Sequence, residues 1–330
     1  SLASTALSLP IVSNNTPSAT TVLSFLGPLG TFTDQALLTQ KDLGICDLNP
    51  LASIPEVLHC VSDGRSDLGF VAIENSIEGS VNITQDTLTF ETDVLIQREV
   101  VISVQMNLLV NSDVALADIE EVVSFPHATA QCRQWLADNL PNAVHRAANS
   151  TAEAAQHLAE SKALNIATIG SARASEVYGL NILAEDIEDH PENQTRFVLV
   201  AKEGIPAATG HDKTSLIIFQ RADRVGSLLG ILQEFAARTI NLTRLESRPT
   251  KQTLGDYCFL IDIEGHIADE LVADCLRVLH MKHGHVKFLG SYPTDSGNSD
   301  GQDKDIREAA SNASQEAQAW LTDLRNQLPE

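Results

Sequence analysis

A dense group of polar side chains follows the apolar run at residues 70–73, and this segment is the best suited to chemistry in the sequence. Its members carry carboxylate, amide and hydroxyl groups or, at one position, a glycine: Glu74, Asn75, Ser76, Glu78, Gly79 and Thr84. Amides and hydroxyls both donate and accept hydrogen bonds, whereas ionised carboxylates only accept them. A turn with a helix N-cap needs only one such residue. The segment therefore favours a ligand site, with a capped turn as the alternative.

A second group lies more than a hundred residues later, immediately before the apolar run at residues 198–200. It reads Asn193-Gln194-Thr195-Arg196-Phe197. An arginine beside amide and hydroxyl groups can hold a carboxylate through two parallel hydrogen bonds. The alternative is a surface ion pair, which would contribute only about 0–1 kcal/mol. Taken together, Asn193, Thr195 and Arg196 indicate a site.

A third group, GPLGTFT at residues 27–33, lies where a first strand meets a first helix. Glycine lets a ligand approach the backbone amides, and a helix N-terminus favours an anion. A tight turn between strand and helix explains the same glycines without a ligand. The loop is no Walker A motif, because no Gly-Lys-Ser/Thr follows.

These groups need elements to position them, and the hydrophobic pattern supplies an alternation of strands and helices. Strands are predicted at residues 22–27, 69–73, 101–110, 121–125 and 163–170. Helices are predicted from about residue 33, through 132–140, after a cap at Ser150 or Thr151, and from residue 171. This order predicts an α/β architecture with parallel strands, in which ligands bind at the carboxyl ends of the strands.

A second unit is predicted after a linker at residues 204–213, which is rich in Gly, Pro and small polar residues. Its order is strand 215–220, helix 226–238, strands 241–247 and 256–263, helix 268–282 and strand 286–292. That βαββαβ order is typical of a ferredoxin-like unit. We expect a disordered leader at 1–21, a first domain at 22–203, a second at 214–293, and a polar tail with a short helix at 294–330.

Composition limits the possible partners of the chain. The 330 residues include 43% hydrophobic ones, enough for two cores, and the formal net charge of −22 argues against nucleic acid. Five cysteines without a CxxC pair suggest neither a disulfide framework nor a zinc site, so we expect a reducing cytoplasm. No apolar stretch approaches the roughly 18 residues of a membrane helix, and the first twenty residues lack a signal-peptide pattern.

Taken in order, the three polar groups resemble the motifs of prephenate dehydratase: GPxGTFT at 27–33, IENSxEGxV at 73–81 and NxTRF at 193–197. The later segments GSLL at 226–229, INL at 240–242 and ESRP at 246–249 resemble the ACT domain that binds phenylalanine in that family. The resemblance covers about residues 22–293. It implies a two-lobed catalytic domain similar to type II periplasmic binding proteins, with the active site between the lobes, followed by a regulatory ACT domain.

The resemblance implies a reaction that converts prephenate to phenylpyruvate, CO2 and water without a metal or organic cofactor. The residues it points to as catalytic are Thr195, Asn75 and Gln131. Those it points to as substrate-binding are Thr31, Ser76, Glu78, Gly79, Ser124, Arg196 and Phe197. One motif departs: Phe125 and His127 stand where the family usually has His and Gln, so neither receives the family's role.

For the second unit, the resemblance implies L-phenylalanine as an allosteric effector and a homo-oligomer, either a dimer or a tetramer. The expected effector-binding residues are Gly226, Ser227, Leu228, Leu229, Asn241, Glu246, Ser247, Arg248 and Pro249. Leu228 and Leu229 also fit an ordinary helix core. The alternatives for the whole chain are an arogenate dehydratase, which acts on the amino analogue of prephenate, and a non-catalytic aromatic amino-acid sensor of the same architecture.

Overall fold

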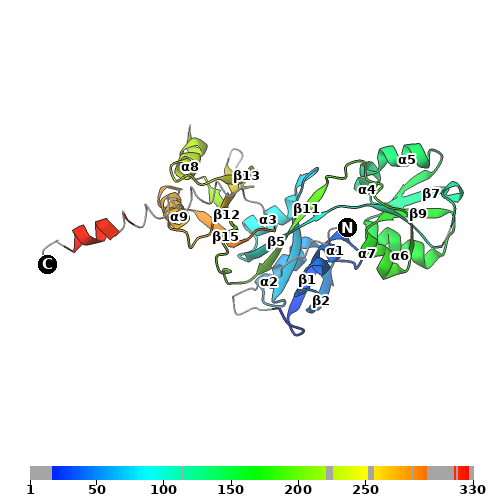
Figure 1. Cartoon of the computed structure of the whole chain (residues 1–330), viewed down its shortest axis with the longest axis horizontal. Coiled ribbons are helices and arrows are strands. Elements are labelled where there is room, and N and C mark those ends of the chain that lie inside the picture. The colour runs from blue at the N-terminus through cyan, green and yellow to red at the C-terminus, as the bar shows by residue number, and fades with distance from the viewer. Residues whose placement is uncertain are drawn as a thin grey trace. The chain divides into compact units, whose positions relative to one another are not determined.

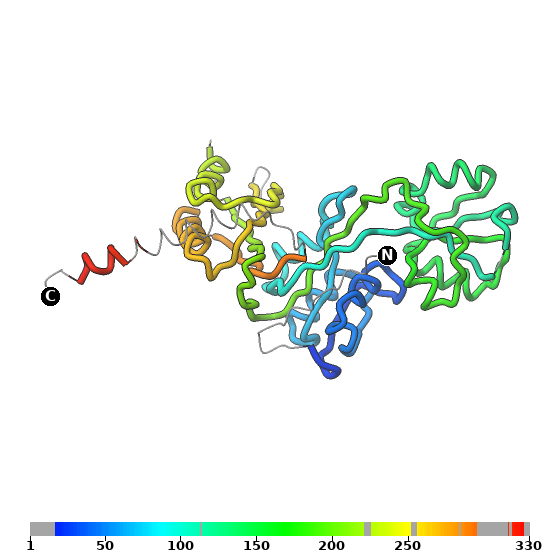
Figure 2. The backbone as a smooth tube through the Cα atoms, in the orientation of Figure 1, coloured from blue at the N-terminus to red at the C-terminus, as the bar shows by residue number. Residues whose placement is uncertain are grey.

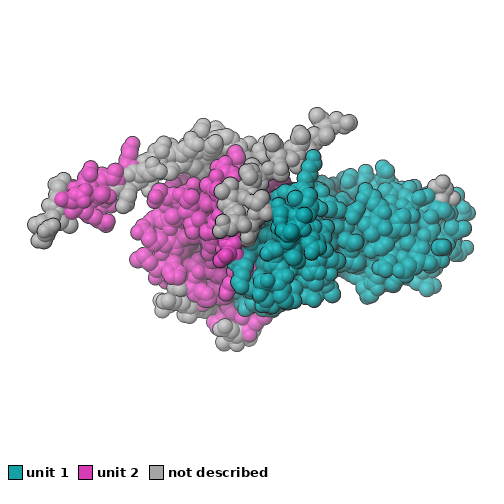
Figure 3. Space-filling model, turned by 90° about the horizontal axis from the view of Figure 1, so that it is seen from below, with its two compact units in different colours: residues 1–10, 15–92, 100–202 teal, residues 11–14, 93–99, 203–330 magenta. Residues whose placement is uncertain are grey.

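A computed structural model of the chain describes residues 17–112, 114–220, 226–251, 256–283, 285–295, 316 and 319–326. The chain divides into two units (Figure 3): one takes in residues 15–92 and 100–202, and the other residues 93–99 and the chain from 203 onward. Most of the expected leader and most of the expected tail lie outside the described residues, although residues 319–325 of the tail are helical. No helix in the described part is long and apolar enough to cross a membrane.

The first sheet has six strands in the order β2-β1-β3-β11-β5, with β4 paired to β3. Its strands are β1 (Val22–Leu26), β2 (Asp47–Leu51), β3 (Leu68–Asn75), β4 (Gly79–Ser80), β5 (Leu95–Ser103) and β11 (Gln194–Ala201). The helices beside it are α1 (Phe32–Thr39), α2 (Ile54–Ser62) and α3 (Asn82–Phe90). Thr31 caps α1 and Ser53 caps α2 by accepting backbone N–H groups of the first turn, which fixes where each helix begins.

The alternating pattern predicted parallel strands, but this sheet contains both parallel and antiparallel pairs. β1 pairs parallel with β2 and β3, but β11 runs antiparallel to β3. The prediction was wrong for β11 because this strand does not follow a helical crossover from its neighbour. It returns to the first sheet from a second one.

The second sheet has five strands in the order β10-β6-β9-β7-β8. They are β6 (Asn107–Val110), β7 (Glu121–Ser124), β8 (Val144–Ala147), β9 (Ile166–Gly170) and β10 (Asn181–Ala184). Around it lie the 3₁₀ turn η1 (Leu116–Asp118) and helices α4 (Pro126–Gln131), α5 (Arg133–Asn139), α6 (Thr151–Ser161) and α7 (Ala172–Tyr178) (Figure 1). Ser150 caps α6, as predicted, by accepting the Glu153 N–H at 3.0 Å.

The chain passes twice between these two sheets, once after β5 and once before β11 (Figure 2). The single strand predicted at 101–110 is therefore two strands, because residues 104–106 form the first passage. The passages are joined: the Val104 N–H donates to the Asn193 carbonyl at 2.8 Å, and the Met106 N–H donates to the Glu188 carboxylate at 2.7 Å. Two sheets joined by two passages confirm the two-lobed, periplasmic-binding-protein-like α/β fold.

The helix predicted at 132–140 is interrupted at its start. Cys132 leaves helical geometry between α4 and α5, with φ −112° and ψ 17°. The Asp189 carboxylate accepts from the Gln134 N–H at 3.0 Å and the Trp135 N–H at 3.3 Å, so α5 begins anew at a carboxylate from a distant loop. The spacing of apolar residues along this helix could not predict the contact with Asp189.

The C-terminal sheet has four antiparallel strands in the order β13-β14-β12-β15. Its elements are β12 (Asp212–Phe219), α8 (Ser227–Ala236), β13 (Leu242–Pro249), β14 (Tyr257–Glu264), α9 (Glu270–His283) and β15 (Val286–Pro293). Buried residues of both helices, including Ile231, Phe235 and Leu279, share one core with the sheet. The predicted ferredoxin-like βαββαβ unit is confirmed.

Candidate active site

The antiparallel pairing of β3 with β11 unites two of the polar groups singled out in the sequence. Thr195 lies directly opposite Asn75, and Arg196 lies opposite Glu74. A parallel β11 would have carried its first residues to the other edge of the sheet. The antiparallel direction of β11 therefore creates the candidate site.

Asn75 is the centre of this pairing. Its side-chain Oδ1 accepts from the Ile77 and Glu78 N–H groups, both at 3.0 Å, which closes the turn after β3. Backbone amides can only donate, so Nδ2 must face the opposite way. It donates to Asn193 Oδ1 at 2.8 Å and to Thr195 Oγ1 at 2.9 Å, with the Gln194 carbonyl at 3.2 Å.

The network extends from Asn193 into the second lobe. Asn193 Nδ2 donates to Gln131 Oε1 at 3.1 Å, and Gln131 Nε2 donates to Glu78 Oε1 at 2.8 Å. Asn193 is only 1% exposed. Asn193 belongs to the group that indicated a site in the sequence, but it is not among the residues expected to catalyse the reaction or bind substrate. Its only signal was its place two positions before Thr195.

His127 also belongs to the network, although the family resemblance gave it no role. Its Nδ1 lies 3.0 Å from Glu78 Oε1, the oxygen that Gln131 also contacts. Its ring stacks on Phe125 with centroids 5.2 Å apart. Of the two residues that depart from the family motif, His127 therefore contacts Glu78, and Phe125 contacts His127.

The other residues of the two motifs have mixed surroundings. The Ser76 Oγ accepts from the Gln194 N–H at 2.9 Å, so it fastens the two strands together. Arg196 Nη1 lies 3.5 Å from Glu74 Oε2, and the Arg196 side chain is 10% exposed against 38% for Glu74. Phe197 is 1% exposed and stacks on Phe70, so it can influence a substrate only by fixing its neighbours. Gly79 has φ +80°, which allows the bend between β3 and β4.

The glycine loop at residues 27–30 contacts α7. The Ser171 Oγ donates to the Gly30 carbonyl at 2.8 Å, and the Tyr178 hydroxyl donates to the Leu29 carbonyl at 2.7 Å. A Cβ on Gly30, which has φ +86°, would lie 3.0 Å from Tyr178 Cε2 and 3.1 Å from Ala174 Cα. Close packing between the lobes therefore requires this glycine. Neither the ligand-site interpretation nor the tight-turn interpretation of the sequence predicted this packing.

Thr31 and Asp34 stabilise the same loop from α1. The Thr31 Oγ1 accepts from the Asp34 N–H at 3.2 Å as the helix cap. Asp34 is buried, and its Oδ2 accepts from the Gly30 N–H at 2.9 Å and from Arg173 Nε at 3.0 Å. Burial by itself would lower the pKa of the Arg173 guanidinium, but its hydrogen bonds to Asp34 and Glu176 raise it above its ordinary value. This ion pair joins α1 to α7.

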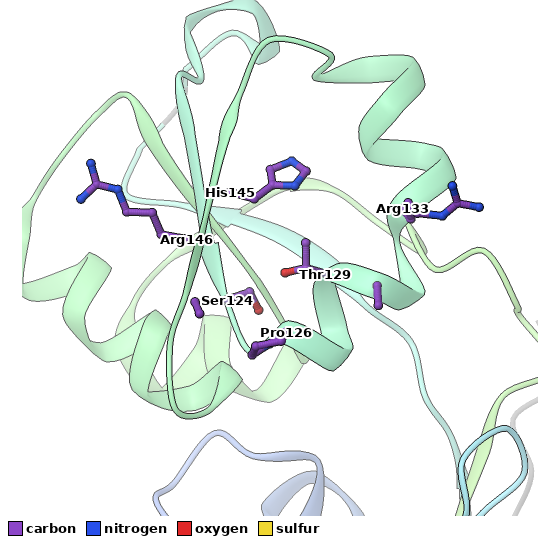
Figure 4. Close-up of a pocket in the computed structure, with 8 residues that line it drawn as sticks. Ser124, Pro126, Thr129, Arg133, His145 and Arg146 are labelled. Carbon is purple, nitrogen blue, oxygen red and sulfur yellow. The ribbon is translucent and has the colours of Figure 1, made fainter.

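Ser124 is the last residue of β7, just before α4. Its hydroxyl is buried and donates to the Ile169 carbonyl at 3.1 Å. It also lines a pocket of about 380 Å³ between α4 and β8, together with Arg133, His145 and Arg146 (Figure 4). Gln131 and His127 project from a different face of α4, toward Glu78, and Thr195 does not line this pocket. The hydrogen-bonded network is the better candidate for chemistry, because it contains the positioned hydroxyl.

The expected effector-binding residues lie at the start of α8 and along β13. Gly226 has φ +81° just before α8, Leu228 packs partly against the core, and Leu229 is 59% exposed. Glu246 forms ion pairs with Arg244 and Arg248. Ser227 begins α8, Pro249 ends β13, and the Asn241 carbonyl accepts from the Glu264 N–H at 3.0 Å. Ser247 lies between Glu246 and Arg248 on β13.

No group of three or more metal-ligating side chains occurs among the residues that the structure describes.

Comparison with known proteins adds independent evidence. The family model for prephenate dehydratase matches residues 23–205, and the model for the ACT domain matches residues 214–280. A prephenate dehydratase from Mycolicibacterium vanbaalenii is 39% identical over 322 residues, covering 93% of this chain and 99% of that protein.

Two solved structures are also similar. Prephenate dehydratase from Arthrobacter aurescens, in complex with L-Phe, has a TM-score of 0.82 at 38% identity and covers 92% of this chain and 99% of its own. GqqA, described as a novel type of quorum quenching acylase, has a TM-score of 0.75 at 28% identity, with 83% and 98% covered. The two family models together span both lobes and most of the C-terminal unit. The chain belongs to the prephenate dehydratase family and carries a C-terminal ACT domain.

Proposed function

We propose that this chain converts prephenate to phenylpyruvate, CO2 and water, and that the Thr195 hydroxyl acts at the departing ring hydroxyl. The observation that carries the proposal is the hydrogen bond from Asn75 Nδ2 to Thr195 Oγ1, at 2.9 Å. It fixes the hydroxyl at the edge of the sheet, beside amide groups from both lobes. Among the residues that the structure describes, the Thr195 hydroxyl accepts a hydrogen bond but donates none, so its hydrogen can serve a substrate.

The chemistry requires such a donor. Loss of CO2 and hydroxide aromatises the ring, so the reaction is strongly downhill, but hydroxide leaves slowly unless a proton or strong hydrogen bond reaches it. A threonine hydroxyl is too weak an acid to give up its proton unaided. We therefore assign Thr195 the role of hydrogen-bond donor to the leaving oxygen, with water as the final proton source.

The two carboxylates of prephenate need different treatment. The ring carboxylate loses its charge as CO2, so a tight cationic clamp would stabilise the ground state more than the transition state. The pyruvyl carboxylate persists and can be held firmly. We propose Arg196 for it, because a guanidinium can hold a carboxylate through two parallel hydrogen bonds. Asn75, Ser76 and Gln131 then orient the ring.

The test is a direct assay of phenylpyruvate absorbance with prephenate as substrate. Turnover of prephenate supports the proposal, and its absence in folded protein would leave the sensor alternative. Arogenate assayed side by side decides the other alternative: a kcat/KM for arogenate above that for prephenate would make the chain an arogenate dehydratase. We place the reaction in the cytoplasm, which suits five buried cysteines of which none forms a disulfide.

For the ACT unit, we propose feedback inhibition by L-phenylalanine in a homo-oligomer. The Arthrobacter relative was solved with L-Phe, and the present chain has a backbone at Gly226 with φ +81° beside the exposed Leu229. An apolar side chain bound at Leu228 and Leu229, with its ammonium group at the Glu246–Ser247 backbone, would couple effector binding to pairing of ACT domains. Calorimetry with phenylalanine and light scattering measure the two parts separately. Absence of binding at millimolar phenylalanine would refute the regulatory part.

A further inference from the structure

Glu78 receives two donors on one oxygen. Gln131 Nε2 lies 2.8 Å and His127 Nδ1 3.0 Å from Glu78 Oε1, and both side chains come from α4. Residues four apart on a helix share a face, so α4 presents both donors together. An ionised carboxylate can only accept hydrogen bonds. Glu78 therefore dictates which end of the Gln131 amide faces it.

That choice passes along the network. With Gln131 Nε2 on Glu78, its Oε1 faces Asn193, so Asn193 must offer Nδ2 to it, at 3.1 Å. This orientation turns Asn193 Oδ1 toward Asn75, and Asn75 donates to it at 2.8 Å. The Glu78 N–H donates to Asn75 Oδ1 at 3.0 Å, which closes a ring of four residues in which every member donates to the next. Hydrogen bonds arranged in one direction polarise and strengthen one another.

The direction of this ring decides what Thr195 can do. Asn75 also donates to Thr195 Oγ1 at 2.9 Å, with the Gln194 carbonyl further away at 3.2 Å, so the hydroxyl accepts and its own hydrogen stays available. A reversed Asn75 amide would present its oxygen to Thr195 and consume that hydrogen. The backbone amides of Ile77 and Glu78 fix Asn75 from one end, and the Glu78 carboxylate fixes Gln131 from the other. Both constraints favour the same direction of hydrogen bonds around the ring.

We propose that Glu78 is a positioning residue: acting through Gln131, Asn193 and Asn75, its carboxylate sets the hydrogen-bond direction that leaves the Thr195 hydroxyl hydrogen free for the substrate. This proposal rests on the proposed function and replaces the expectation that Glu78 binds substrate directly. His127, as the second donor, holds the carboxylate in place.

The kinetic test compares three variants in the phenylpyruvate assay. Glu78→Met keeps the length of the side chain but removes the acceptor, and we expect kcat to fall about tenfold with KM within about twofold. Glu78→Gln restores an acceptor oxygen and should recover most of kcat. The matched control is Glu120→Met, which removes an exposed glutamate that accepts from Asn165 Nδ2 at 2.7 Å and should leave kcat unchanged. A raised KM with unchanged kcat would instead show direct substrate contact and overturn the proposal.

A double-mutant cycle separates positioning from an independent effect. If Glu78 acts through Thr195, then Glu78→Met should change kcat less than about twofold once Thr195→Val has removed the hydroxyl. A full tenfold effect in that background would overturn the proposal.

A second readout does not need turnover. In ¹⁵N-labelled protein, Glu78→Met should shift the side-chain NH₂ resonances of Gln131, Asn193 and Asn75, whereas Glu120→Met should shift none of them. A shift confined to Gln131 would overturn the relay. If the wild-type chain fails to turn over prephenate, the proposed function fails, and the resonances still decide whether Glu78 sets the direction of the ring.

Discussion

Replacing Thr195 by valine removes one hydroxyl and changes little else. Valine has the same branched shape and suits a strand, so β11 should keep its pairing with β3. Asn75 Nδ2 loses the acceptor at 2.9 Å but keeps Asn193 Oδ1 at 2.8 Å. Thr195 is only partly buried, so water can replace the lost partner, and the free energy of unfolding should fall by no more than about 1 kcal/mol.

The rate should fall much further. A donor that acts on the leaving oxygen as negative charge develops contributes about 2.7–4 kcal/mol, so Thr195→Val should lower kcat by about 10²–10³. KM should change little, because the lost interaction belongs mainly to the transition state. Thr195→Ser keeps the hydroxyl but loses the methyl group that limits its rotation, so its kcat should stay within about tenfold of wild type.

The assay follows phenylpyruvate absorbance over a range of prephenate concentrations, with thermal denaturation as the check on folding. A folded Thr195→Val variant with kcat within threefold of wild type would remove Thr195 from the chemical step. A large rise in KM at constant kcat would assign it to ground-state binding instead.

Three further predictions concern parts of the chain outside the Thr195 network. Gly30→Ala should lower the free energy of unfolding by about 2–5 kcal/mol, because strain at positive φ adds to overlap with α7, whereas Gly179→Ala, at φ +65° in open space, should cost about 1–2 kcal/mol in the same thermal melts. Leu229→Ala should weaken phenylalanine binding about tenfold by calorimetry, while Met281→Ala, equally a loss of exposed apolar surface, should not. Burial raises the pKa of the Cys132 thiol from 9.0 to about 12, so a thiol reagent at pH 8 should leave it unmodified in native protein. In denaturation at increasing pH, the same shift should reduce stability from about pH 9 to 12, because the unfolded thiol ionises first; rapid native labelling would contradict the assignment.

Sequence patterns located most elements but not the way they are joined. The strand predicted at 69–73 lies within β3, and the helix predicted from about residue 33 corresponds to α1 at residues 32–39. The passage at residues 104–106 was missed because its apolar residues continue the pattern of the strands on either side. The break at Cys132 depends on Asp189, more than fifty residues away. The spacing of apolar residues indicates which face of one segment is buried. It cannot predict a contact with a residue that is distant in the sequence, such as Asp189.

In the candidate site, too, individual residues were predicted from the sequence but the contacts between them were not. Asn75 and Thr195 were predicted because polar residues at strand ends are chemically conspicuous. Asn193 was recognised as part of the polar group at residues 193–197 but was given no role of its own, and the sequence did not indicate that it is buried. Its importance comes from the antiparallel register of β11, which no motif encodes. Family resemblance supplied the reaction, but the GqqA likeness shows that a related fold also carries a different description, so the assignment of activity depends on side chains such as Thr195.

The two departures from the family motif are consistent with this network. Position 127 usually holds glutamine in the family, and a glutamine amide could donate to the Glu78 carboxylate as His127 Nδ1 does at 3.0 Å. The histidine therefore preserves the hydrogen bond while changing the group that makes it. Phe125 stacks on the imidazole at 5.2 Å and so limits its rotation. A ring held by its neighbour can direct one nitrogen at Glu78 as reliably as a flexible amide, because fewer rotamers compete. On this argument the two substitutions act as a pair: the aromatic at 125 suits the histidine at 127.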